Sequence, residues 1–248
     1  MLIRLIDMKC LRLVVVALAM TLSLVALSAL SPAPLLAQRS APVGTGDTFK
    51  DASSFKPPAG ARVAIIEYQD LQCPACAHAF PIVHQAADHY KIALVERDFP
   101  LPQHVVLGST DGAIWARYLQ EKVSMKVADD YRGAFFASQT GIQNKDDALN
   151  FTRRFFQSHQ LQMPFVPDPT GQYVKEIAAD KALGERIGVQ HTPTIIVCSQ
   201  REWVNVTDVS LLYQTIEEVA AKAGTATAAK VGATTGVKAA VTKKKTVQ

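Results

Sequence analysis

The feature that most constrains this chain is a pair of cysteines, Cys73 and Cys76, placed directly after a short run of β-forming residues. That run, at 63–68, is separated from a second β-forming run at 92–96 by about 20 residues, which is enough for one helix. The spacing predicts a strand, a helix and a second strand that pairs in parallel with the first through a right-handed crossover. The two cysteines therefore fall where the first strand ends and the helix begins.

At a helix start the two sulfurs of such a pair have different environments, because the first is exposed and the second lies deeper. The unpaired N–H groups and the positive dipole end of the helix predicted over 75–90 point at Cys73 and stabilise its thiolate. Pro74 suits the first helical turn, where its missing N–H costs nothing. Thiolates are the species that attack and leave in disulfide exchange. The pattern thus predicts Cys73 as the redox nucleophile and Cys76 as the resolving thiol.

A cysteine pair of this spacing also occurs as half of a zinc site or as a structural clip. Zinc would need two further ligands, and the sequence contains no second Cys-x-x-Cys. We interpret the nearby His78 and His84 as ordinary positions on an amphipathic helix, so no metal and no other cofactor is predicted. Cys198 lies in an apolar run and is interpreted as a small buried core residue, with a regulatory thiol as the alternative.

Two polar features accompany the cysteine pair. Glu67 lies six residues before Cys73 in an otherwise apolar strand. It is either a residue at the strand end that faces water or a buried carboxylate behind Cys76, with a raised pKa, that exchanges a proton with the buried thiol. Thr192-Pro193 precedes a β-forming run at 194–198. The proline is an ordinary strand initiator unless its peptide bond is cis, in which case the Thr192 backbone approaches the cysteines and pairs with an extended substrate.

The N-terminus carries the pattern of an export signal. A short basic stretch precedes 26 residues, 13–38, without charge or histidine, and Ala37 supplies a small residue suited to cleavage by signal peptidase. An uncleaved membrane anchor is the alternative, since about 18 to 20 apolar residues span a bilayer. In both cases we expect the body of the protein outside the cytoplasm, in the periplasm or another extracytoplasmic space.

Helical periodicity replaces the β-pattern between residues 105 and 187, and Trp115, Phe135 and Phe136 occupy core positions in it. Turn signals divide this stretch into about four helices, the last opening after Thr170. The chain is therefore predicted to be an α/β protein whose core is split by a helical insertion. The expected segments are a signal peptide or anchor at 1–37, a linker at 38–60, the first core part at 61–104, the insertion at 105–187, the second core part at 188–221, and a disordered Lys/Ala/Thr-rich tail at 222–248.

Charge is distributed unevenly along the chain. The formal net charge of +4 includes six lysines in 222–248 and a net +2 in residues 1–37, which leaves about −4 for the body. A nucleic-acid-binding face would need clustered Lys and Arg on the folded part, so no nucleic-acid partner is predicted. The basic tail is either a solvated segment or an electrostatic contact with an anionic envelope surface.

Three segments together resemble the DsbA-like branch of the thioredoxin superfamily, which consists of exported thiol-disulfide oxidoreductases. They are Glu67-Tyr-Gln-Asp-Leu-Gln-Cys-Pro-Ala-Cys76, Arg97-Asp-Phe-Pro-Leu-Pro102 and Gly188-Val-Gln-His-Thr-Pro-Thr194. The likeness extends over residues 60–222, and the ordered set is far more specific than Cys-x-x-Cys alone. It implies a thioredoxin fold with an inserted all-helical domain. It also implies these roles: Cys73 as the attacking cysteine, Cys76 as its partner, Glu67 as the buried acid, and Pro193 as the cis-proline preceded by the substrate-binding Thr192.

The sequence departs from that family at two places. Pro74-Ala75 stands where the best-studied DsbA oxidases have Pro-His, and Ala75 offers neither a hydrogen bond nor a charge to the thiolate. His191 stands where many relatives have a small residue, and it either lines the site or serves as an ordinary loop residue.

Three functions follow from these observations. The first is a dithiol oxidase that takes electrons from reduced or misfolded exported proteins and is re-oxidised by a membrane partner resembling DsbB or a vitamin K epoxide reductase homologue. The second is a periplasmic disulfide reductase of thioredoxin type that uses the same cysteines in the opposite direction. The third is a non-enzymatic envelope binding module with a structural disulfide. Redox potential separates the first two, at about −120 mV for DsbA and about −270 mV for thioredoxin.

Overall fold

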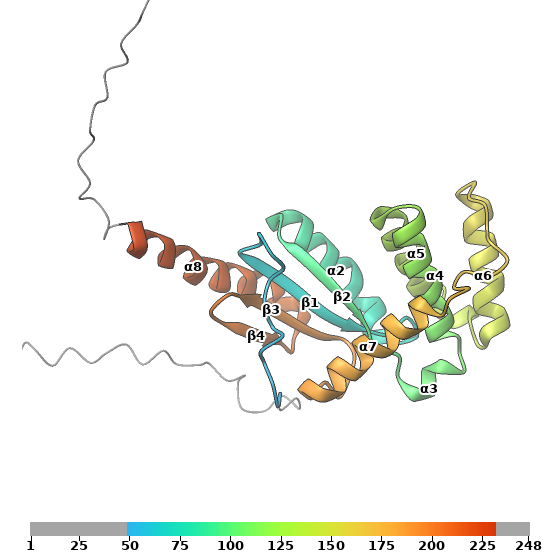
Figure 1. The fold of residues 1–248 in the computed structure, drawn as a ribbon, viewed down its shortest axis with the longest axis horizontal. Helices are drawn as coiled ribbons and strands as arrows, with labels where there is room; N and C mark the ends of the chain where they lie inside the picture. Colours follow the sequence, from blue (N-terminus) through green and yellow to red (C-terminus); the bar gives the residue numbers. More distant parts are fainter. Residues whose placement is uncertain (1–48, 232–248) are drawn as a thin grey trace, which may run out of the picture. The chain divides into compact units, whose positions relative to one another are not determined.

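The computed structural model describes residues 49–231, with side chains up to residue 224. The predicted signal peptide or anchor at 1–37 and residues 232–248 of the predicted tail lie outside the described residues. In chain order the elements are β1 (Val63–Gln69), α2 (Pro74–Tyr90), β2 (Ala93–Asp98), α3 (Pro102–Val105), α4 (Ser109–Lys122), α5 (Met125–Ala137), the short η1 (Gln139–Gly141), α6 (Lys145–Ser158), α7 (Gln172–Ile187), β3 (Thr194–Ser199), β4 (Trp203–Val206), η2 (Val209–Leu211) and α8 (Leu212–Val231) (Figure 1).

The sheet has the strand order β2-β1-β3-β4, which places β1 in its interior. β1 and β2 are parallel, whereas β3 is antiparallel to both β1 and β4. The strand–helix–strand unit predicted from the spacing is therefore confirmed, with α2 as the crossover. Every residue of β1 is buried. This explains its largely apolar sequence, because both faces of the strand are covered.

Different elements cover the two faces of the sheet. Val63 and Ile65 of β1 pack in a cluster with α2 and α8, whereas Ala64 and Ile66 pack with the end of α7 and the segment before β1 (Figure 1). Because side chains alternate along a strand, Glu67 points to the same side as Val63 and Ile65. The acid therefore lies on the side of the sheet that α2 covers.

The predicted all-helical insertion lies between β2 and β3, and its last helix, α7, begins just after Thr170 as expected. Seven aromatic side chains from α4, α5 and α6 form its core: Trp115, Tyr131, Phe135, Phe136, Phe151, Phe155 and Phe156. Cys73 and Cys76 belong to the same cluster. The cysteine pair therefore lies at the junction between the sheet domain and the insertion.

The segment before β1 differs from the linker predicted over 38–60. Phe49, Phe55 and Trp203 make mutual edge-to-face contacts, with ring centroids 5.0, 5.4 and 5.2 Å apart. Phe55 is only 1% exposed. Two aromatic residues within a Ser-, Pro- and Gly-rich composition are enough to attach residues 49–60 to the domain, since each buries a large apolar surface.

The last helix also differs from its predicted extent. α8 continues to Val231, past the end expected at Ala221, so residues 222–231 of the predicted disordered tail are helical. Alanine has the highest intrinsic helix propensity, and this stretch is rich in it. Ala223 also packs against the apolar cluster shared by α2 and α8.

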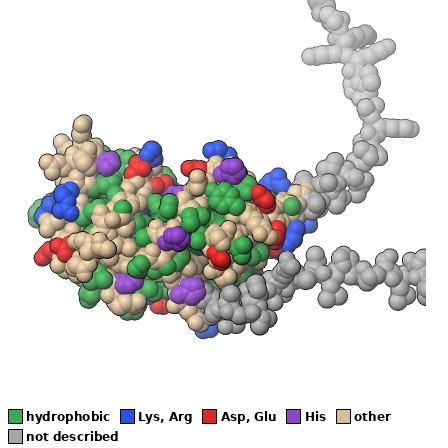
Figure 2. All heavy atoms as spheres, turned by 180° about the vertical axis from the view of Figure 1, so that it is seen from behind, with side chains coloured by type: hydrophobic (Ala, Val, Ile, Leu, Met, Phe, Trp, Pro, Cys, Tyr) green, Lys and Arg blue, Asp and Glu red, His purple; other side chains and the backbone are tan. Residues whose placement is uncertain are grey.

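The surface and the helices of the described part bear on possible partners. On the face shown in Figure 2, acidic and basic side chains are interspersed among hydrophobic ones. This pattern is unlike the clustered Lys and Arg of a nucleic-acid-binding face. No helix within residues 49–231 combines the length and the apolar composition that crossing a membrane requires.

Candidate active site

The cysteine pair begins α2. Cys73 is the N-cap residue and Pro74 occupies the first helical turn. The Cys73 N–H donates to the Asp70 carbonyl at 2.9 Å, and the Ala77 N–H donates to the Cys73 carbonyl at 3.1 Å, which closes the first turn. Cys76 lies one turn further along and is completely buried. Both residues are free thiols, so the site is present as a dithiol.

Cys73 is less exposed than the sequence predicted, at 7%. Two segments that are distant in sequence cover it. The Cys73 Sγ atom lies 3.2 Å from the Thr192 carbonyl oxygen, to which the thiol donates when it is protonated. Gln139 Nε2, from the insertion, donates to the carbonyl oxygens of Leu71 and Cys73 at 2.7 and 3.0 Å. A helix start exposes its first side chain only where no other segment packs over it. The predicted order still holds, because Cys76 is fully buried.

The two thiols have opposite electrostatic environments. A hydrogen bond from the Cys76 thiol is the largest effect on Cys73, and together with the Thr192 side chain and the N–H groups of Cys76 and Ala75 it outweighs burial and lowers the pKa of Cys73 to about 5. Burial, followed by the closeness of Cys73, raises the pKa of Cys76 far above its ordinary value. At neutral pH Cys73 is therefore the thiolate and Cys76 the thiol, as expected for an attacking and a resolving cysteine.

The loop before β3 brings the predicted substrate-binding residues to the cysteines. The Thr192–Pro193 peptide bond is cis. Thr192 is buried, and its side chain is one of the groups that lower the pKa of Cys73. His191 is exposed beside it, and the His191 carbonyl accepts a hydrogen bond from the Thr194 hydroxyl at 2.8 Å. The structure thus places Thr192 against Cys73, while the role of Thr192 and Pro193 in substrate binding stays a prediction.

Glu67 is completely buried, which excludes the alternative in which it faces water. Neither carboxylate oxygen has a hydrogen-bond partner within the described residues. Burial is the main reason that the pKa of Glu67 rises to about 8, and the charge of the neighbouring Glu96 adds to the effect. Glu67 is one of the charges that act on Cys76. A protonated carboxyl near a buried thiol has the properties of a proton donor, and this role remains a prediction.

Asp70, which the sequence reasoning did not single out, organises the loop between β1 and α2. Its carboxylate accepts hydrogen bonds from the N–H of Gln72 at 2.8 Å and of Leu101 at 2.7 Å, and from the Ser109 hydroxyl. The Asp70 N–H itself approaches the Cys76 sulfur at 3.5 Å. A sequence signal was present, since Asp70 is part of the motif that ends at Cys76.

A buried ionic network between the sheet and the insertion was also missed. Arg132 of α5 is 2% exposed, donates to Asp98 Oδ1 at 2.9 Å, and lies 3.8 Å from Glu96. Arg117 of α4 also binds Asp98, at 2.7 Å. Burial opposes ionisation of both carboxyls, but Arg132 and Arg117 lower the pKa of Asp98, and Arg132, His84 and Gln69 lower the pKa of Glu96. Arg132 follows Ala128 by four residues on a helix face that is otherwise apolar, and this position could have revealed it.

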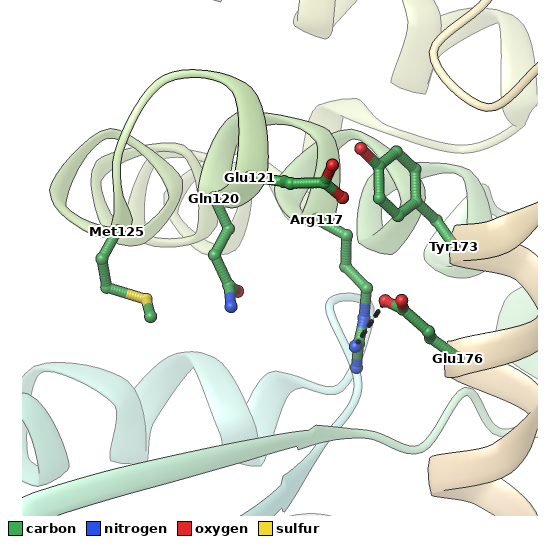
Figure 3. Close-up of a pocket in the computed structure, with 6 residues that line it drawn as sticks. All are labelled: Arg117, Gln120, Glu121, Met125, Tyr173 and Glu176. Carbon is green, nitrogen blue, oxygen red and sulfur yellow. Dashed lines mark hydrogen bonds and ion pairs between the residues drawn. The ribbon is translucent and has the colours of Figure 1, made fainter.

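A pocket between α4 and α7 lies apart from the predicted site residues. Figure 3 shows its lining: Arg117, Gln120, Glu121, Met125, Tyr173 and Glu176. Arg117 and Glu176 point toward each other across it and are paired at 3.3 Å. Because Arg117 is also bound by Asp98 and Asp180, its charge is already compensated by protein groups.

Comparison with known proteins identifies the family. A thioredoxin family model matches residues 59–208, which covers both parts of the sheet domain and the insertion. The chain belongs to the thioredoxin family. No curated protein matches it in sequence.

Solved structures with the same fold include three bacterial proteins. The thiol-disulfide exchange protein α-DsbA2 from Wolbachia pipientis is 17% identical, with 66% of this chain and 84% of that chain covered and a TM-score of 0.51. A thioredoxin-like oxidoreductase from Silicibacter pomeroyi is 22% identical, with 65% and 88% covered and a TM-score of 0.51. DsbA2 from Pseudomonas aeruginosa is 19% identical, with 66% and 91% covered and a TM-score of 0.50. The predicted thioredoxin fold with an inserted helical domain, of DsbA type, is confirmed.

Proposed function

We propose that this thioredoxin-family protein is an exported thiol-disulfide oxidoreductase that acts as a dithiol oxidase through Cys73 and Cys76. The observation that carries the proposal is the pairing of a Cys73 thiol whose pKa is lowered to about 5 with a fully buried Cys76 one helical turn away. Disulfide exchange requires such an asymmetric pair, because one sulfur must ionise to attack and leave while the other keeps its proton.

The reaction begins with the oxidised enzyme, in which Cys73 and Cys76 form a disulfide. A substrate thiolate attacks the Cys73 sulfur, the Cys73–Cys76 bond breaks, and Cys76 leaves and takes up a proton, for which Glu67 is the proposed donor. A second substrate thiolate then attacks the substrate sulfur of the mixed disulfide, and Cys73 leaves as a thiolate. The substrate has lost two electrons and gained a disulfide, and the enzyme has become the dithiol.

The low pKa of Cys73 favours the oxidase direction. The attacked sulfur must leave in the second step, and a thiol of low pKa leaves faster. A stabilised thiolate also stabilises the reduced enzyme, which makes its disulfide a stronger oxidant. Ala75 contributes only its backbone N–H to this effect, and the hydrogen bond from the Cys76 thiol is its largest cause.

We infer partners and location from the same chemistry. The substrates are reduced or misfolded exported proteins, whose extended segments lie along Thr192 and Pro193. A membrane re-oxidase resembling DsbB or a vitamin K epoxide reductase homologue regenerates the disulfide. The basic and apolar N-terminal sequence, 1–37, supports a periplasmic or other extracytoplasmic location.

The decisive experiment is the equilibrium redox potential of the purified protein against glutathione. A potential near about −120 mV supports the oxidase, and one near about −270 mV would indicate a thioredoxin-type reductase instead. Oxidation of a two-cysteine peptide should disappear in Cys73→Ser and survive in Cys198→Ala, which removes a buried thiol away from the pair. Full activity of Cys73→Ser would remove both enzyme hypotheses and leave a binding module with a structural disulfide.

A further inference from the structure

Away from the dithiol, three side chains that commonly bind metals converge from three different elements. His84 of α2, Glu96 of β2 and Asp129 of α5 each offer one ligand atom, and these atoms lie within 4.8 Å of one another. His84 Nε2 is 3.4 Å from Glu96 Oε1. The three residues are half-buried, so a hydrated ion can reach them and then exchange part of its water for protein ligands. The sequence alone had given His84 no role beyond its place on a helix.

Neighbouring residues hold two of these ligands in position. Gln69 Nε2 donates to Glu96 Oε1 at 2.7 Å, and the same oxygen contacts His84 Nε2 at 3.4 Å, a contact that a bound ion would replace. The His84 ring packs on the Phe80 ring, with centroids 4.0 Å apart. Contacts of this kind fix the orientation of metal ligands in known sites, and they form here between protein groups alone.

The charges around the cluster favour the binding of a cation. Arg132 is the adjacent positive group, but its closest bond is to Asp98, at 2.9 Å, and its Nε lies 3.8 Å from Glu96 Oε2. Glu96 and Asp129 therefore bring two carboxylates to the half-buried site. The neighbouring Arg132 is shared with the carboxylate of Asp98. A divalent cation between Glu96 and Asp129 would be attracted by both, in surroundings that screen less than water.

We propose that His84, Glu96 and Asp129 form a binding site for a first-row divalent metal ion, for which Zn²⁺ is the natural probe. One imidazole and two carboxylates suit this class, whereas Mg²⁺ and Ca²⁺ prefer sites made of oxygen alone. Zinc bonds of about 2.0 to 2.2 Å place tetrahedral ligand atoms about 3.4 Å apart. His84 Nε2 and Glu96 Oε1 already have this spacing, so only the Asp129 oxygen has to move closer. The ion would join α2, the sheet and the insertion.

This site is separate from the cysteine pair, although Glu96 lies beside Glu67 in the sheet. His84 follows Cys76 by eight residues on α2, which is about 12 Å along the helix axis.

The test of the metal site uses the full chain with Cys73→Ser and Cys76→Ser, because thiolates bind zinc themselves. Calorimetric titration with ZnCl₂ should give one ion per chain. The melting temperature should rise when zinc is added.

Single substitutions in that background locate the ion. His84→Ala and Asp129→Asn should each weaken zinc binding by at least about tenfold, and Gln69→Ala by about tenfold through the loss of its hydrogen bond to Glu96. His89→Ala is the matched control, since it removes an exposed histidine from the same helix and should leave binding unchanged. Circular dichroism checks that each variant is folded.

X-ray absorption at the zinc edge provides a readout that does not depend on any variant of the cluster. The expected spectrum has one imidazole among nitrogen and oxygen ligands. The proposal is overturned if the folded double-serine protein binds no zinc, if His84→Ala binds as well as its parent, or if the spectrum requires two or more imidazoles. None of these outcomes alters the redox potential or peptide oxidation by the unmodified chain, so the two proposals fail independently.

Discussion

Cys73→Ser should destabilise the reduced protein at pH 7 far more than at pH 4. The pKa of Cys73 in the folded protein is about 5, against an ordinary value of 9.0. The unfolded chain therefore binds more protons between these values, and the stability that the thiolate provides is complete above pH 9 and is lost as the pH falls through 5. Neutral pH lies two units above 5, and at about 1.4 kcal/mol per unit the thiolate contributes about 3 kcal/mol.

The assay is urea unfolding of the reduced protein and of Cys73→Ser, followed by the fluorescence of Trp115 and Trp203, at pH 7 and pH 4 in a reductant that does not contain thiols. The difference in unfolding free energy between the two proteins should shrink by about 3 kcal/mol from pH 7 to pH 4. Serine changes the packing as well, but that effect is the same at both pH values.

Cys198→Ala supplies the control for this measurement. Cys198 is fully buried and burial raises its pKa to about 11, so it is a neutral thiol at both pH values. Its removal should cost the same at pH 7 and pH 4. A difference between wild type and Cys73→Ser that does not change with pH would refute the assignment of Cys73 as a stabilised thiolate.

Three further substitutions test other parts of the structure by urea unfolding. Glu67→Gln should raise the unfolding free energy at pH 7 by about 3 kcal/mol, because the carboxyl, with its pKa raised to about 8 in the folded protein, ionises at pH 7 only in the unfolded chain and so favours unfolding. The same substitution should slow disulfide exchange. Equal stability of the two proteins at pH 7 would contradict this reasoning. Arg132→Met should cost about 3 to 5 kcal/mol, because it leaves Glu96 buried without an arginine and Asp98 with Arg117 alone. A neutral result would show that this arginine does not stabilise the network. Gly184→Ala should cost about 1 to 3 kcal/mol, because its new methyl group would lie 2.6 Å from the Phe99 ring, whereas Gly141→Ala, with no atom within 4 Å, should be close to neutral.

Much of the fold could be predicted because its signals are local. The β-forming runs, the helical periodicity and the turn residues each depend on neighbours in sequence, and the observed strands and helices follow them within a few residues. Pro74 and the two cysteines marked the start of α2 for the same reason. The larger errors fell at the ends of the domain, where Phe55 and Ala223 are fixed by contacts with residues far away along the chain.

The sequence by itself determined that Cys73 and Cys76 begin a helix after a buried strand, since a strand followed by Cys-Pro-x-Cys requires nothing distant. Only the tertiary structure decided what surrounds them. Glu67 is buried by elements from other parts of the chain, and the contact of Thr192 with Cys73 and the salt bridge of Arg132 to Asp98 each join segments more than 30 residues apart. Such contacts depend on how helices pack on a sheet, and packing is a property of the folded chain that no local pattern encodes.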